Sequence, residues 1–142
     1  MPTVKELIDA VDGFLQAAKS IHGAYEPYSW GPGYSQFERK TSFPIEVGGE
    51  LPRAARLDIV GFPLDPDQRF RLSLCFNCAI CRLDYTKETH FNTMRIESDG
   101  IPYVVKGPHF HSWRLNRRFF KGASTAPKLH NAEPFSMAAS FD

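Results

Sequence analysis

The chain has little cysteine and no long apolar run. Its 142 residues hold only three cysteines, Cys75, Cys78 and Cys81, clustered in one short stretch. An odd, clustered set differs from the disulfide framework of a secreted domain, so we expect reduced thiols. No apolar run approaches the roughly 20 residues of a membrane helix. Lys5 and Glu6 interrupt the first apolar stretch, which argues against a signal peptide. The sequence therefore predicts a cytoplasmic protein with no membrane contact.

The chain also lacks an excess of charge of either sign. Seventeen Lys and Arg residues face sixteen Asp and Glu residues, which gives a net charge of +1. Any site for a polyanion must therefore be a local patch. Hydrophobic residues make up 42% of the chain and include 12 Phe, which is enough apolar material for a core. A chain of this length forms one domain, so residues 1–142 are expected to fold as a unit.

Apolar periodicity predicts an α+β fold. Thr3 and Glu6 have the spacing of a capping box, and apolar residues recur at helical steps up to a stop signal at Gly23. We expect an amphipathic helix over 3–22, packed on a mainly antiparallel sheet of about five strands. An aromatic loop rich in Pro and Gly is expected over 23–35, a β-rich region over 36–120 and an irregular tail over 121–142, with a short helix after Pro134.

Period-two alternation marks the strands within the β-rich region. A first strand is expected over 36–47, broken or pushed to a sheet edge by Pro44, and a second over 53–62. The clearest hairpin covers 69–85, with its turn near Asn77 and Cys78. Later strands are expected over 101–105 and 109–115.

The most informative motif is the pair His109 and His111. Residues two apart in a strand point to the same side, so the two imidazoles would lie together. Such a pair can bind a transition metal, transfer protons near neutral pH or line a polyanion site. His90 would add a third imidazole if the long connection folds back. The alternative is that these histidines are ordinary strand residues.

A basic segment follows the histidines. Positive charges alternate with aromatic residues between Arg114 and Lys121, and such a pattern can bind phosphates and stack on unpaired bases. We expect a nucleic-acid-binding segment here, formed by Arg114, Arg117, Arg118 and Lys121. The alternative is a solvated basic edge with one phenylalanine in the core.

Two Arg-x-Asp segments recur in predicted strands, at Arg56 to Asp58 and at Arg82 to Asp84. If the two strands are neighbours, opposite charges would meet across the sheet in a structural ladder. The functional interpretation makes Arg82 a cation that stabilises a transition state and Asp84 the residue that orients a histidine.

The cysteines have metal-like spacing but an incomplete ligand set. Cys75, Cys78 and Cys81 surround a tight turn, yet zinc needs four ligands and no second cysteine pair is present. We therefore expect free thiols, no cofactor and no metal. Zinc held by these thiols with His90 or another histidine is the alternative.

Part of the chain resembles a known toxin family. Phe70 to Asn92, with its Arg-Leu-Asp-Tyr and Glu-Thr-His-Phe-Asn segments, and the Gly-Pro-His-Phe-His segment from Gly107, resemble the small toxins of bacterial toxin–antitoxin systems of the TumE-like kind. The resemblance covers about the central third of the chain. It implies a toxin that acts on RNA or translation and is held inactive by a partner antitoxin. The site residues that it implies are Arg82, Asp84, His90, His109 and His111.

The resulting hypothesis is a toxin-type, metal-independent endoribonuclease. One of His109 and His111 would be the general base on the 2′-hydroxyl, and the other, or His90, the general acid on the leaving oxygen. Arg82 and Arg117 would stabilise the charge that develops on the phosphorus centre.

The alternative is a non-enzymatic inhibitor, encoded by a mobile element, that binds a host or defence complex. Its contact residues would be aromatic side chains of the loop, which are typical interface anchors, namely Tyr25, Tyr28, Trp30 and Tyr34.

Overall fold

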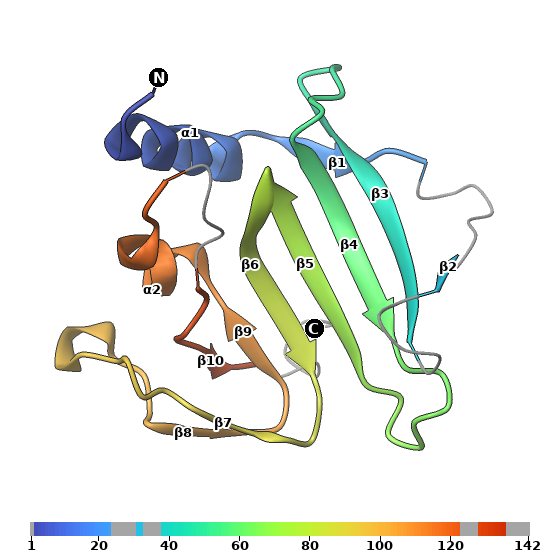
Figure 1. Cartoon of the computed structure of the whole chain (residues 1–142), viewed down its shortest axis with the longest axis vertical. Coiled ribbons are helices and arrows are strands. Elements are labelled where there is room, and N and C mark those ends of the chain that lie inside the picture. The colour runs from blue at the N-terminus through green and yellow to red at the C-terminus, as the bar shows by residue number, and fades with distance from the viewer. Residues whose placement is uncertain (1, 24–30, 33–37, 123–127, 136–142) are drawn as a thin grey trace.

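The computed structural model describes residues 2–23, 31–32, 38–122 and 128–135. The aromatic residues Tyr25, Tyr28, Trp30 and Tyr34 lie outside these ranges, as does most of the segment expected to form a helix after Pro134. The described part is α+β, as the sequence predicts: an N-terminal helix accompanies a largely antiparallel sheet (Figure 1). None of the described helices has the length and apolar character needed to cross a membrane.

Helix α1 begins as predicted and ends early. It covers Val4–Gln16, and the predicted capping box is present, with the amide of Glu6 donating to the Thr3 hydroxyl. The prediction that the helix continues to residue 22 is wrong. Ala17 is already extended, and strand β1 (Lys19–Ile21) pairs with the end of strand β3 (Arg39–Val47). Pairing with the sheet therefore overrides the local signal for a longer helix.

The described residues form a main sheet of eight strands, somewhat more than the number of about five that the sequence predicts. The spatial order is β1-β3-β4-β5-β6-β9-β10, with β2 also pairing to β3. After β1, these strands are β2 (Gly31–Pro32), β3 (Arg39–Val47), β4 (Ala55–Gly61), β5 (Phe70–Phe76), β6 (Cys78–Tyr85), β9 (His109–His111) and β10 (Glu133–Pro134). The extra strands are short edge elements, whose patterns are too brief to read from sequence.

The hairpin of β5 and β6 is confirmed, with Asn77 at its turn. Asn77 has φ of 69°, in the left-handed region that Asn tolerates better than most residues. Two other expectations are wrong. Pro44 does not break β3, because it lies inside the strand opposite Arg56 and its carbonyl accepts from His22. The strand expected over 109–115 stops at His111, because Ser112 caps the short helix α2 (Trp113–Asn116).

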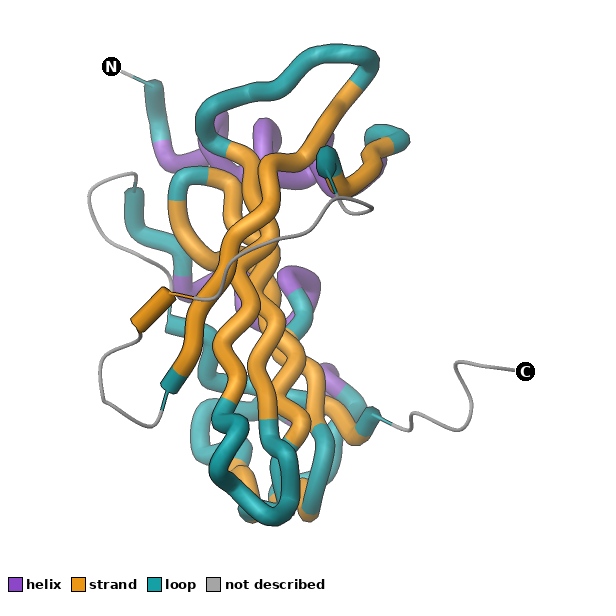
Figure 2. Tube along the Cα trace, turned by 90° about the vertical axis from the view of Figure 1, so that its right-hand side faces the viewer, coloured by secondary structure: helices purple, strands orange, loops and turns teal. Residues whose placement is uncertain are grey.

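The two faces of the sheet differ in character. One face packs on α1 around a core that includes Phe14, Ile45 and Trp113, and Phe14 stacks on Phe76 at 4.7 Å between ring centroids. By strand alternation the opposite face carries the polar residues of β4, β5 and β6, including both Arg-x-Asp segments. Figure 2 shows the long strands twisting around one another along the length of the sheet.

A small second sheet completes the fold near the β6–β9 end. Its strands are β7 (Thr89–Phe91) and β8 (Val104–Lys106), with the 3-10 turn η1 (Glu97–Asp99) between them and η2 (Arg117–Phe119) after α2. The fully buried Asn92 joins this hairpin to the later chain, since its side chain bonds both the carbonyl and the amide of Ala132. Asn116 similarly bonds the carbonyl and the amide of Asn131.

Candidate active site

The two histidines of β9 lie against the Arg-x-Asp segment of β6. In the antiparallel register His109 faces Asp84 and His111 faces Arg82. All four side chains point to the same side of the sheet, away from α1, because paired residues share a face. The structure thus brings together four of the five residues that the sequence analysis named as catalytic.

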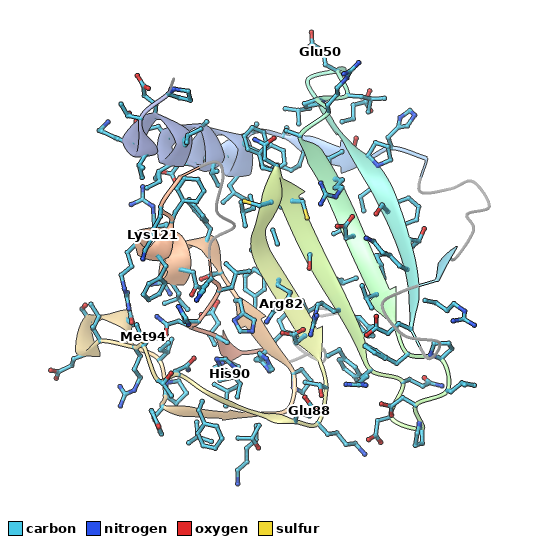
Figure 3. All side chains as sticks on the ribbon, in the orientation of Figure 1. Glu50, Arg82, Glu88, His90, Met94 and Lys121 are labelled. Atoms are coloured by element: carbon cyan, nitrogen blue, oxygen red, sulfur yellow. The ribbon has the colours of Figure 1, made fainter. Side chains whose placement is uncertain are left out.

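The fifth residue, His90, joins them from the second sheet. Its ring centroid lies 5.0 Å from that of His109 and 4.9 Å from that of His111. The centroids of His109 and His111 are 5.0 Å apart. Figure 3 shows His90 below Arg82, at the end of the molecule where the hairpin of β7 and β8 passes the main sheet. The three rings form what we call the histidine cluster.

Asp84 contacts two arginines and two histidines of the site. Its Oδ1 accepts from Arg71 Nε at 2.8 Å and its Oδ2 from Arg82 Nε at 2.9 Å. The same Oδ2 lies 3.2 Å from His111 Nε2 and 3.4 Å from His109 Nε2. Burial alone would raise the pKa of Asp84, but hydrogen bonds from both histidines, the charge of Arg82 and the bond from Arg71 hold the pKa below its ordinary value. Asp84 is therefore a carboxylate at neutral pH.

The two β9 histidines have different environments. Burial lowers the pKa of His109, but its hydrogen bonds to Asp84 and to the carbonyl of Gly107 outweigh burial and raise the pKa overall. Burial also lowers the pKa of His111, and the charge of Arg82 adds to this, so its pKa lies below the ordinary value despite Asp84. Arg82 Nη2 lies 3.2 Å from His111 Nε2. The pKa values of two neighbouring imidazoles are thus shifted in opposite directions.

His90 and His111 each have one ring nitrogen without a partner in the part of the chain that the structure describes. The Nε2 of His90 donates to the carbonyl of His130 at 2.8 Å, which leaves its Nδ1 with a lone pair. His111 is 1% exposed, and its Nδ1 has no hydrogen-bond partner among the described residues. Buried polar atoms are rarely left unpaired, so this nitrogen needs an explanation.

The histidine cluster is also the group of side chains best placed to hold a metal. One nitrogen from each ring lies within 4.8 Å of the others, and no second group of three or more potential ligands occurs in the described ranges. The cysteines do not converge. Cys75 bonds Asp58 on the polar face, whereas Cys78 and Cys81 pack against the core on the other face. Burial, the first cause in both cases, raises the pKa of Cys75 and of Cys81 to about 11, which keeps them as thiols.

A cavity of about 200 Å³ opens beside the cluster. His90 and His109 line it, together with the carboxylates of Asp84 and Glu88. The remaining lining residues that matter chemically are three arginines and three aromatic residues, namely Arg69, Arg71, Arg82, Phe62, Phe70 and Tyr85. His111 is not part of the wall, so it acts on the cavity only through its neighbours.

Sequence reasoning missed Arg71 and the groups that position His90. Arg71 lies opposite Asp84 in the β5–β6 hairpin, so extending the hairpin register by sequence would have found this pair. The His130 carbonyl is held in place by the buried Asn92 and Asn131 contacts, and nothing in the local sequence indicates that this late segment returns to β7.

The basic segment does not reach the cluster. Arg117 pairs with Asp12 of α1 at 2.7 Å, on the face of the sheet opposite the histidines, so the prediction that Arg117 assists Arg82 is wrong. Arg118 pairs with Asp99 at 2.7 Å and Arg114 lies 4.0 Å from Glu133. Among the aromatic residues, Phe120 is buried in the core. Lys121 lies beside α2, far from His90 in Figure 3. Nucleic-acid binding by this segment stays a prediction, and it would take place away from the histidines.

The expected charge ladder is also wrong. Strand β5 separates β4 from β6, so the two Arg-x-Asp segments are not neighbours. Each arginine instead bonds the aspartate of its own segment, Arg56 to Asp58 at 3.1 Å and Arg82 to Asp84 at 2.9 Å.

No family model, curated protein or solved structure matches this chain. The resemblance to TumE-like toxins therefore stays a prediction, and a function can be inferred only from the chemistry of the site itself.

Proposed function

We propose that this chain cleaves phosphodiester bonds of RNA in the cavity beside the histidine cluster. The observation that carries the proposal is that Arg69, Arg71 and Arg82 share one small cavity with two imidazoles. Guanidinium groups bind phosphate oxygens with matched, two-pronged geometry. Cations and proton-transferring or metal-binding nitrogens in one cavity suit phosphoryl transfer.

Asp84 orients two of the cavity's arginines so that they can bind an anion. Asp84 binds Arg71 and Arg82 through their Nε atoms, one on each carboxylate oxygen. The Nη atoms of Arg71 make no hydrogen bond within the described part of the chain, and its side chain is 48% exposed. Preorganised donors of this kind stabilise developing charge by about 3 kcal/mol each.

The aromatic residues of the cavity favour a single-stranded nucleic acid over a simple phosphate. Phe70 and Tyr85 stack at 4.9 Å, and the guanidinium of Arg69 lies 3.8 Å above the ring of Phe62. Unpaired bases stack on such aromatic and guanidinium surfaces. RNA is the proposed substrate because it offers exposed bases next to a scissile phosphate.

The test is cleavage of a fluorogenic single-stranded RNA by the purified chain. Arg71→Ala should lower kcat/KM about 100-fold, since it removes one charge-stabilising group. The control is Arg56→Ala, which removes an arginine from the same face of the sheet but outside the cavity. Equal activity in the two folded variants, or no cleavage by the wild type, would refute the proposal.

Toxicity and control by an antitoxin are proposed on the resemblance alone. Their test is growth after induced expression of the wild type and of Arg71→Ala, with and without co-expression of a candidate antitoxin. The alternative of an inhibitor that binds a host complex rests on loop residues outside the described ranges, and alanine changes at Tyr28 and Trp30 would test it.

A further inference from the structure

We infer that His90, His109 and His111 form a binding site for a transition-metal ion of the zinc type. The binding claim rests on the geometry of the cluster and not on the proposed function. It differs from the metal-independent chemistry expected from the sequence.

The spacing of the ring nitrogens is close to that of a metal site. In a tetrahedral centre with zinc–nitrogen bonds of about 2.0–2.1 Å, neighbouring ligand atoms lie about 3.3 Å apart. One nitrogen from each ring lies within 4.8 Å of the others, so the rings must rotate closer together to bind one ion. Imidazole nitrogen is a preferred ligand of zinc, copper, nickel and iron.

Two of the rings are already oriented in the way that metal-bound histidines are. His109 Nδ1 bonds the Gly107 carbonyl at 2.9 Å, and His90 Nε2 bonds the His130 carbonyl at 2.8 Å. A ligating histidine almost always donates its other N–H to a carbonyl or carboxylate, which fixes the ring and its tautomer. The contacts leave His90 Nδ1 free to bind an ion. His109 Nε2 lies 3.4 Å from Asp84 Oδ2 and would exchange that contact for the ion.

His111 provides evidence for a bound ion that is independent of the other two rings. Its side chain is 1% exposed, its Nε2 faces Asp84 at 3.2 Å, and its Nδ1 is buried with no partner among the described residues. A ring held by a carboxylate on one nitrogen and unpaired on the other has the arrangement of a carboxylate–histidine–metal triad. A metal bond would satisfy the nitrogen that the protein leaves unpaired.

The described residues offer no free fourth ligand. Asp84 is the nearest carboxylate, but Arg71 and Arg82 already bind both of its oxygens. Three protein ligands with an open position are typical of catalytic zinc rather than structural zinc. The open position next to the arginine-lined cavity suits a water molecule or a phosphate oxygen, and only this last step rests on the proposed function.

The experiment is titration of the chelator-treated full-length chain with Zn²⁺ by calorimetry, and with Co²⁺ by absorption spectroscopy. We expect one site per chain and a cobalt spectrum of tetrahedral type without a thiolate charge-transfer band. His90→Ala should weaken Zn²⁺ binding by more than about 100-fold, whereas His22→Ala, at an exposed position outside the cluster, should leave it unchanged. Circular dichroism checks the fold, and His90→Gln replaces His90→Ala if the latter unfolds.

The possible outcomes test the metal site and the proposed RNA cleavage separately. A folded wild type that binds no ion, equal binding by the His90 and His22 variants, or a thiolate band would overturn the metal site. Zinc binding lost with His90 but no RNA cleavage would uphold the site and refute the proposed function. RNA cleavage that persists in protein shown to bind no metal would uphold the function and refute the site.

Discussion

The two Arg-x-Asp segments share sequence, strand geometry and sheet face, but they have very different neighbours. In β4, Asp58 accepts from Arg56 and Ser42 and lies 3.6 Å from the Cys75 sulfur. In β6, the equivalent Asp84 binds Arg82 and a second arginine and contacts two histidines. The motif is the same, so the chemistry is set by the residues that the adjacent strands place opposite it.

The comparison also separates a single ion pair from a network of charges. Both carboxylates are largely covered, but Asp58 has one charged partner while Asp84 has two arginines and the imidazoles. A pair near the surface adds little to stability, whereas a buried charge left without its partner is expensive. Removing the two aspartates should therefore have unequal effects.

The largest expected difference is in stability. Asp84→Ala should lower the free energy of unfolding by about 3–5 kcal/mol, because it leaves two arginines and two imidazoles around one uncompensated site. Asp58→Ala should cost only about 1 kcal/mol. Urea unfolding followed by circular dichroism measures both values. Equal losses would show that the two segments are energetically equivalent despite their neighbours.

The second difference concerns reactivity. Cys75, beside Asp58, is buried, and its pKa of about 11 lies two units above the ordinary value of 9.0. A raised thiol pKa means less thiolate at pH 8, so alkylation by iodoacetamide should be about 100-fold slower in the folded protein than in urea. Cys81, with a pKa also of about 11, should behave alike. Mass spectrometry of the labelled peptides is the measurement. Rapid labelling of Cys75 would show a reactive thiol beside Asp58, which we do not expect.

A third difference is expected between the arginines of the two segments, Arg82 and Arg56. Arg82→Lys keeps the charge but loses the fork that joins Asp84 to His111, so RNA cleavage should fall about 10-fold. Arg56→Lys should leave the cleavage rate unchanged, since its fork contacts only Asp58. Steady-state kinetics on the same RNA substrate compares them. A loss shared by both variants would mean that the whole polar face contributes.

The smallest effect is expected at Ser42, which donates to Asp58 from β3. Ser42→Ala removes one partly exposed hydrogen bond and should lower the free energy of unfolding by about 0.5–1 kcal/mol, without changing cleavage. Thermal unfolding checks the first part and the RNA assay the second. Reduced cleavage would connect the β4 segment to the active site.

Some of this site could be predicted from sequence, and the reasons for success are local. The capping box of Thr3, the β5–β6 hairpin and the shared side of His109 and His111 depend on residue spacing within one element. Strand alternation alone fixes these relations. The five residues named from the sequence do converge in the structure.

The remainder depends on contacts between segments that are distant in sequence. His90 reaches the cluster because the β7–β8 hairpin and the His130 segment are held together by buried asparagines, 40 residues apart for Asn92 and Ala132. Arg117 follows the histidines closely in the sequence, but it comes directly after helix α2 and pairs with Asp12 of α1. Local patterns do not specify such pairings, so they could not be predicted.

The central claim is that the histidine cluster is required for cleavage of RNA by this protein. The most direct measurement is cleavage of single-stranded RNA by the wild type, His90→Ala and His22→Ala, each confirmed to be folded. We predict cleavage by the wild type and by the His22 variant, and a loss of at least about 100-fold with the His90 variant. Equal cleavage by all three proteins would place the chemistry elsewhere and contradict the account.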